Sequence, residues 1–276
     1  MAIKNSVLVA TYNYLKDQGI MLGTRLSPLY AKDYFLEIAK GNIKGTTHIE
    51  KFGNKEDVGT DWSVIWSGNS PYTGFNATTA EPVNISSTSI EDSITGTGLR
   101  KVRLYGLGDG YISQTEELEL DGTNAVTSTL SFIRLDRIWG YEDNEIASNR
   151  ENIGVITATQ SITPDITFAI IPIGHNSTMM ALYTVPAGKT AYIYSRTATI
   201  ANKQTATVEV RFKQRNYGSV FRVGGVAGLN SSGTGLASLN FKVPICLAEK
   251  TDFFLEAAAS SSCGVSSYIT IVLEDN

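Results

Sequence analysis

The residue types that perform acid–base, nucleophilic or metal chemistry are sparse in this sequence of 276 residues. It contains two histidines, His48 and His175, so a site built from several imidazole ligands is nearly excluded. A Ser-His-Asp triad needs only one histidine, but the sequence has no Gly-x-Ser-x-Gly segment at a predicted strand-to-helix turn. We therefore expect no catalytic residue, no metal site and no cofactor.

Acidic residues offer the remaining route to catalysis. Glu117 and Glu119 share one face of a predicted strand, roughly 7 Å apart. Two carboxylates at that spacing could hydrolyse a glycoside, but a solvated strand face explains them more simply. Residues 141–145 lack the ligand spacing and the glycine of an EF-hand loop. A hydrolase is therefore the least favoured of the three functions that this sequence suggests. We expect the protein not to be an enzyme.

Glycine-rich segments and net charge argue against nucleotides and nucleic acids as ligands. A strand-like pattern follows Gly106–Gly110, whereas a phosphate cradle needs a helix at that point. The segments 224–228 and 231–235 are likewise expected to form turns, together one mobile loop. The net charge of −4 argues against non-specific electrostatic binding to the phosphates of a nucleic acid. No window approaches 18 consecutive apolar residues, so we expect no membrane partner either.

Cysteine usage and the N-terminus indicate synthesis in a cytoplasm. The two cysteines, Cys246 and Cys263, are 17 positions apart and form no CxxC motif. Two unpaired thiols at strand positions are favoured, and a single disulfide is the alternative. The apolar run Val7–Ala10 is shorter than a signal-peptide core, and no small-residue cleavage site follows it.

Residues 1–58 are expected to form an N-terminal attachment arm with one helix at about 28–40. Ser27 can cap that helix, Pro28 suits its first position, and Gly41 follows its end. Its apolar residues recur at i, i+3, i+4 and i+7 and form one stripe: Ala31, Tyr34, Phe35 and Ile38. A helix of this length is marginal alone, so the stripe must pack on something. We expect Tyr34, Phe35 and Ile38 to dock the arm in a virion or oligomer, and residues 42–53 to be an extended connector.

From residue 59 onward, apolar residues alternate with polar ones, which is typical of antiparallel strands with one wet face. The clearest case is Thr205–Lys213, with Ala206, Val208, Val210 and Phe212 on one face. Thr127–Trp139 is expected to be one long strand with a bulge at Phe132 and Ile133. The predicted fold is mainly β, with two antiparallel β-sandwich or jelly-roll-like modules after the arm. An acidic, polar stretch at 141–151 divides them, giving sandwiches at 59–146 and 147–276.

Aromatic residues in the second module could contact a sugar or another subunit. Tyr192 and Tyr194 are expected to share a strand face with Arg196, and Tyr217 and Phe221 flank a Gly-Ser-Val step. Aromatic rings on a sheet face can stack on sugar rings, although sheet packing and subunit contacts are commoner uses. A host-glycan-binding adhesin is therefore the second hypothesis.

Several segments in this order resemble a family of virion structural proteins of tailed bacteriophages that is common in aquatic phages. The similarity covers residues 30 to 225, and its motifs are turns, caps and strand edges. The segments that carry it are Ser89–Leu107, Leu120–Thr129, Tyr183–Tyr192 and Arg215–Val223, with Tyr34–Gly45 and Lys51–Asn54 in the leader. None of these motifs is a catalytic signature, and the last 50 residues carry no recognisable motif.

The resemblance implies a place in a particle and not a reaction. We expect a non-enzymatic virion component, assembled in the host cytoplasm, that docks through its arm onto other phage structural proteins. A capsid decoration protein or head fibre bound to the major capsid protein is favoured over a neck or tail component. We expect the protein to be a homo-oligomer, either a trimer or a ring, because symmetry multiplies many weak contacts.

Overall fold

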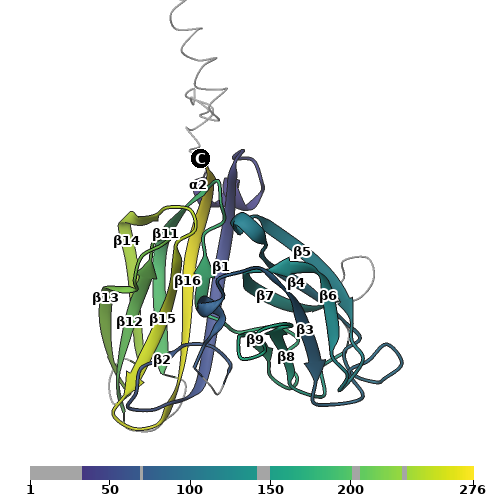
Figure 1. Cartoon of the computed structure of the whole chain (residues 1–276). Coiled ribbons are helices and arrows are strands. Elements are labelled where there is room, and N and C mark those ends of the chain that lie inside the picture. The colour runs from purple at the N-terminus through teal and green to yellow at the C-terminus, as the bar shows by residue number, and fades with distance from the viewer. Residues whose placement is uncertain (1–32, 69–70, 142–149, 201–205, 232–234) are drawn as a thin grey trace, which may run out of the picture. The chain divides into compact units, whose positions relative to one another are not determined.

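Antiparallel strands dominate the computed structural model, which describes residues 33–68, 71–141, 150–200, 206–231 and 235–276 (Figure 1). Within those residues, helical structure is limited to α2 (Tyr34–Ala39) and two 3-10 turns, η1 (Gly74–Asn76) and η2 (Asp109–Tyr111). The chain divides into two compact units, residues 1–48 and residues 49–276. The mainly β class, with antiparallel sandwich modules and one short helix before them, is confirmed.

The helix of the arm begins later than the sequence predicts. Asp33 has an extended backbone (φ −66°, ψ 119°), and its side chain accepts a hydrogen bond from the main-chain N–H of Leu36. Asp33 is therefore the N-cap, and the expected helix at 28–40 is wrong at its start. Its end is as expected, because Gly41 has φ +71°, where glycine is favoured. The expected capping and stripe residues before it lie outside the described residues: Ser27, Pro28 and Ala31.

Two sheets form the main sandwich, which lies within residues 46–64 and 182–275. One sheet has the order β1-β16-β11-β14, and the other has the order β10-β15-β12-β13 with β2 paired to β15. The strands are β1 (Thr46–Val58), β2 (Ser63–Val64), β10 (Leu182–Thr184), β11 (Lys189–Ile200), β12 (Thr207–Arg215), β13 (Arg222–Asn230), β14 (Leu236–Leu247), β15 (Asp252–Ala259) and β16 (Cys263–Asp275). The two sheets share one apolar core, in which Val208, Val210 and Phe212 of β12 are buried as predicted.

The inserted module is formed by the strands between β2 and β10. Its sheets have the orders β6-β3-β8-β9 and β5-β4-β7. The strands are β3 (Glu81–Ser87), β4 (Lys101–Leu107), β5 (Ser113–Glu119), β6 (Val126–Phe132), β7 (Arg134–Tyr141), β8 (Ile156–Gln160) and β9 (Thr167–Ile171). Both sheets contribute to a second apolar core, with Val83, Leu104, Phe132 and Phe168 among its fully buried members.

Strand pairing gives module limits that differ from the expected ones. β8 and β9 follow the expected boundary at 146/147, yet β8 pairs with β3 and β9 pairs with β8. The first module therefore extends to Ile171, and it is inserted into the main sandwich instead of preceding it. Period-2 alternation identifies a strand but not its partner, and partners far apart in sequence set these limits.

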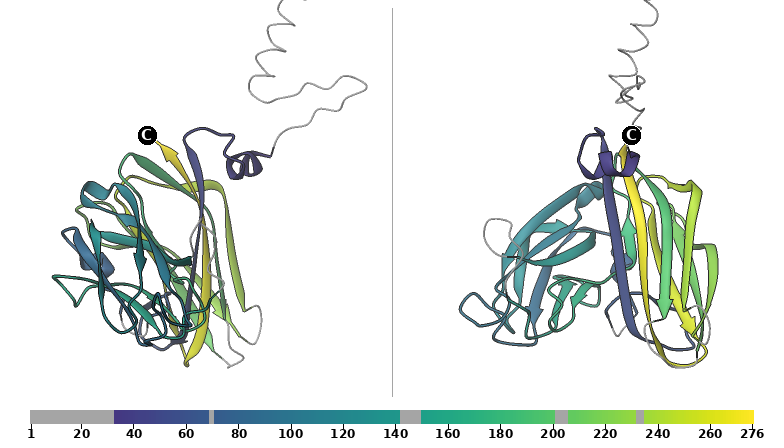
Figure 2. Two further views of the ribbon diagram at one scale, coloured as in Figure 1. Left: turned by 90° about the vertical axis from the view of Figure 1, so that its right-hand side faces the viewer. Right: turned by 180° about the vertical axis from the view of Figure 1, so that it is seen from behind.

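The expected connector after the helix is a strand of the main sandwich. β1 is 13 residues long and pairs with β16, which lies at the far end of the sequence. Figure 2 shows these two strands side by side, in purple and yellow. Asn54 accepts a hydrogen bond from Ser266. A Cβ at Gly53 would lie 2.4 Å from the main-chain nitrogen of Ala181, so only glycine fits there. The expected arm at 1–58 is therefore shorter, because residues 49–58 belong to the β body.

The predicted long strand at 127–139 is two strands that belong to different sheets. β6 ends at Phe132, and β7 begins at Arg134. Between them, the main-chain N–H of Ile133 donates to the carbonyl of Leu107, 2.8 Å away. The adjoining apolar pair Phe132 and Ile133, expected to mark a bulge, marks the crossing from one sheet to the other.

Candidate functional site

The helix α2 presents a run of exposed apolar side chains. Tyr34, Phe35 and Leu36 are 48%, 45% and 51% exposed, and the rings of Tyr34 and Phe35 meet edge to face. Ile38, the third residue expected to dock, is 4% exposed and is not accessible. Leu36 was not among the expected docking residues, because it falls outside the stripe at i, i+3, i+4 and i+7. The exposed large apolar side chains of the described arm are thus Tyr34, Phe35 and Leu36, which we call the arm patch.

A β-bulge in β11 separates Arg196 from the tyrosines with which it was expected to share a face. The register with β16 pairs Ile193 with Ile271 and Ser195 with Thr270, so Tyr194 is the extra residue. One extra residue moves every later side chain to the opposite face. Arg196 therefore points into the core beside the buried Ile269, and the expected grouping is wrong.

Tyr217 and Phe221 lie at the connection from β12 to β13, on the other sheet of the main sandwich. The ring of Phe221 packs edge to face on Phe254, with 5.0 Å between centroids, and under the guanidinium of Arg215. Tyr217 is 67% exposed, and its ring meets Tyr111. The two expected aromatic pairs are thus on different sheets.

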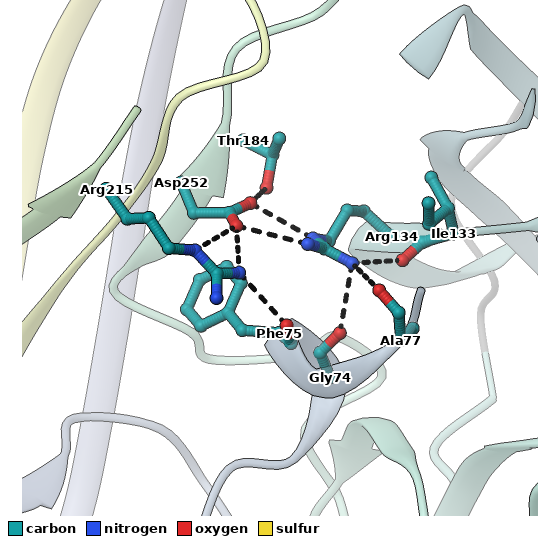
Figure 3. Close-up of polar contacts among 8 residues, drawn as sticks. All are labelled: Gly74, Phe75, Ala77, Ile133, Arg134, Thr184, Arg215 and Asp252. Atoms are coloured by element: carbon teal, nitrogen blue, oxygen red, sulfur yellow. Dashed lines mark hydrogen bonds and ion pairs between the residues drawn. The ribbon is translucent and has the colours of Figure 1, made fainter. Parts of the chain in front are cut away.

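Beside Phe221, three strand ends meet in a buried ion-pair network (Figure 3). Asp252 opens β15, Arg134 opens β7, and Arg215 ends β12. Arg134 donates to both carboxylate oxygens of Asp252, through Nε at 3.0 Å and Nη2 at 3.1 Å. Arg215 donates to Oδ2 of the same carboxylate, and Thr184 Oγ1 donates to Oδ1 at 2.6 Å. We call these residues the Asp252 network.

The Asp252 network joins the inserted module to the main sandwich. Nη1 of Arg134 donates to the carbonyls of Ile133 at 2.7 Å and Ala77 at 2.9 Å. Nη2 of Arg215 donates to the carbonyl of Phe75 at 3.0 Å. The two arginines therefore donate to matching acceptors, which are one carboxylate and a row of main-chain carbonyls. Burial of an ion pair requires such matching. The geometry is that of a structural clamp.

A second buried pair also links the two modules. Lys51 of β1 donates to the main-chain oxygen of Asp136 in β7. Burial lowers the pKa of Lys51 to about 8, and burial raises the pKa of Asp136 to about 6, each against the attraction of the other. Arg137 adds a further link by donating to the carbonyl of Glu50 at 3.0 Å.

The glutamates considered for hydrolysis are bound to neighbouring strands. Glu117 accepts from Nε of Arg103 at 2.9 Å and from the hydroxyl of Tyr141 at 2.5 Å. Hydrogen bonds from Tyr141 and Arg103 lower the pKa of Glu117, whereas a general acid needs a raised one. Glu119 pairs with Lys101 at 3.3 Å. Both glutamates thus form cross-strand ion pairs with β4, and Glu117 also accepts a hydrogen bond from β7.

Other groups with potential chemistry are dispersed. His48 lies exposed on β1, and Nδ1 of His175 is 2.9 Å from the carbonyl of Ile173. Cys246 is exposed, Cys263 is buried, and both are free thiols. Three or more His, Cys, Asp or Glu side chains do not gather at a possible metal site anywhere in the described chain. Over the same residues, no helix is long and apolar enough to cross a membrane.

Comparison with known proteins yields only distant similarity. No protein-family profile and no curated protein matches the chain. Among solved structures, the VP2 subviral particle of infectious bursal disease virus aligns at 10% identity and a TM-score of 0.22, over 85% of this chain and 77% of that one. The structure of the Gt strain of that virus aligns at 9% identity and a TM-score of 0.18, over 88% and 81%. Similarity at these TM-scores carries no argument about fold or function.

Proposed function

We propose that this chain is a non-enzymatic structural component of a tailed-phage virion that docks through its N-terminal arm. The observation that carries the proposal is the arm patch: three consecutive large apolar side chains, each about half exposed, in a unit separate from the β body. Exposed apolar surface of this kind marks a contact with another molecule. The resemblance of residues 30–225 to phage virion proteins supplies the setting for that contact.

The β body fits the same role. Its two modules are clamped together by the Asp252 network and by Lys51 with Asp136, so it can act as one rigid block. Compact modules after a short arm, with no long fibrous repeat in the sequence, suit the outside of a head better than a tail. We therefore propose a decoration protein or head fibre on the major capsid protein, ahead of a neck or tail position.

A glycan-binding adhesin remains the alternative, and the packing of the aromatic residues does not favour it. The rings of Phe221 and Tyr217 are engaged by Phe254 and Tyr111, and Tyr192 and Tyr194 lie on the other sheet. A single sugar-binding platform needs such rings side by side on one exposed face. The structural role therefore stands first.

Polar substitution of the arm patch is expected to remove the protein from particles. The variant Tyr34→Ser/Phe35→Ser/Leu36→Ser should fold, because these side chains are exposed, but should be at least tenfold depleted from purified virions. Quantitative mass spectrometry of particles from a complemented infection measures this depletion. The matched control, Ile112→Ser/Ile162→Ser/Ile173→Ser, changes three exposed side chains of the β body and should be incorporated normally. Normal incorporation of the arm variant would refute docking through the arm.

A further inference from the structure

An open trough lies on the outer face of one sheet of the main sandwich, where β15, β12 and β13 run side by side (Figure 1). The strand register places Ala258 of β15, Glu209 of β12 and Gly228 of β13 in one row across the sheet. This row faces away from the core, because Val208 and Val210, on either side of Glu209, are buried in it. The trough is therefore on the solvent side of the sheet.

Small residues leave the trough empty. Ala258 and Gly228 flank Glu209 on the two neighbouring strands. A Cβ at Gly228 would have no other atom within 4 Å, so the space beside this residue is open. The volume of the trough is about 710 Å³. Sites for small molecules have volumes of about 300–1,000 Å³, so the trough is large enough to hold one.

Trp62 lines the trough and directly precedes β2, the strand that pairs with β15. The guanidinium of Arg211 lies over the Trp62 ring, 3.1 Å from the ring centroid. Nε of Arg211 is also 3.8 Å from Oε1 of Glu209. Arg211 is thus a positioning residue for both an indole ring and a carboxylate. Groups that are held in place before a ligand arrives lose less conformational entropy when it binds.

The remaining chemistry of the trough is neutral and polar. Four lining residues supply hydroxyl or amide groups: Thr60, Thr207, Asn230 and Ser260. Among the described residues that line the trough, Glu209 is the only charged one, and Arg211 offsets its charge. A phosphate-bearing ligand would meet a carboxylate where it needs a cation, so the trough favours a neutral ligand.

An indole ring beside neutral hydrogen-bonding groups matches the surface of a sugar. A pyranose ring presents C–H groups on its faces, which pack on an indole, and hydroxyl groups around its rim. Sugar hydroxyls both donate and accept, so they bond to hydroxyls, amides and carboxylates. We propose that the trough binds a neutral saccharide, with the sugar ring on Trp62 and the sugar hydroxyls bonded to Glu209 and Thr207.

This site differs from the aromatic residues that the sequence suggested for glycan contact. Tyr192 and Tyr194 lie on the other sheet of the main sandwich. Tyr217 and Phe221 follow β12, at the opposite end of that strand from Thr207. The inference adds a binding activity to the structural role and does not depend on it, because the trough belongs to the β body and the arm patch to the other compact unit.

An array of neutral oligosaccharides, probed with the full-length protein, tests the proposal, and calorimetric titration of the strongest ligand measures its affinity. The wild-type protein should bind. Trp62→Ala should weaken binding at least about tenfold, because the sugar loses the ring on which it packs. The matched control is Trp139→Ala, which removes a 43% exposed indole of the inserted module and should bind as the wild type does.

Gly228→Leu blocks the trough without touching Trp62. Gly228 lies in β13 and is not among the glycines with a positive φ, so leucine fits its backbone and points into open space. This variant should lose detectable saccharide binding while its unfolding midpoint in urea stays at or above that of the wild type. An array on which the wild type binds nothing, or binding that survives Gly228→Leu, would overturn the proposal.

Equal losses in Trp62→Ala and Trp139→Ala would overturn it as well, since they would show that the trough is not the site. Virion incorporation separates this inference from the proposed function. Gly228→Leu should be incorporated normally, because it leaves the arm patch unchanged. A chain that enters particles without binding any saccharide would leave the structural role intact and remove only the saccharide site.

Discussion

Replacing Asp252 with alanine is expected to lower the free energy of unfolding by about 3–5 kcal/mol. The carboxylate is 3% exposed and accepts hydrogen bonds from Arg134, Arg215 and Thr184. Its removal leaves Arg134 charged and buried with only main-chain carbonyls as acceptors. An uncompensated buried charge costs far more than the loss of an exposed pair, because water cannot reach the charge that remains.

Equilibrium unfolding in urea measures this change, with the near-ultraviolet signal of the aromatic residues around the Asp252 network as one probe. The matched control is Asp275→Ala, which removes the exposed ion pair with Lys189 and should cost about 0–1 kcal/mol. Asp252→Asn keeps the volume of the side chain and should fall between the two. Equal losses for Asp252→Ala and Asp275→Ala would show that the network does not clamp the modules.

The buried pair of Lys51 and Asp136 is expected to give stability an unusual pH dependence. The pKa of Lys51 is about 8 in the folded protein against an ordinary value of 10.5, so between these values the unfolded chain binds a proton that the folded one does not. The free energy of unfolding therefore rises with pH from about 8 to 10.5. For Asp136, whose pKa is raised from 3.8 to about 6, stability falls as pH rises through that interval.

Unfolding free energies of the wild type and Lys51→Met, compared from pH 7 to pH 10, isolate the lysine. The wild type should gain stability relative to the variant across this range, because methionine has no proton to lose. Lys44→Met changes an exposed lysine and should follow the wild type. A constant difference between wild type and Lys51→Met over this range would contradict a lowered pKa for Lys51.

Local sequence patterns predicted several of the strands and the end of the helix. The alternation at 205–213 gave β12 with the correct buried face, and Gly41 marked the end of α2. In both cases the determinants are a few residues apart, so the sequence displays them directly. The segment 224–228 was expected to be a loop because of its glycines, but it is an edge strand, β13, in which Gly225 makes room for Arg196.

Features set by distant parts of the chain were missed. The Asp252 network joins residues 118 positions apart, and no local pattern encodes such a contact. A signal was present all the same, because Arg134 interrupts an apolar run and Asp252 directly precedes another. The position of Arg196 depended on one bulge residue, Tyr194, which reversed the face predicted by strict alternation. The module limits failed for the same reason, since they depend on strand partners.

Quantitative mass spectrometry of density-purified virions tests the central claim most directly. The measurement is the number of copies of this chain per copy of the major capsid protein, before and after a wash that removes loosely bound protein. A structural component is predicted to be present at a fixed ratio that the wash does not change. Absence of the chain from washed particles, with all of it left in the soluble fraction of the infected cells, would contradict the assignment to the virion.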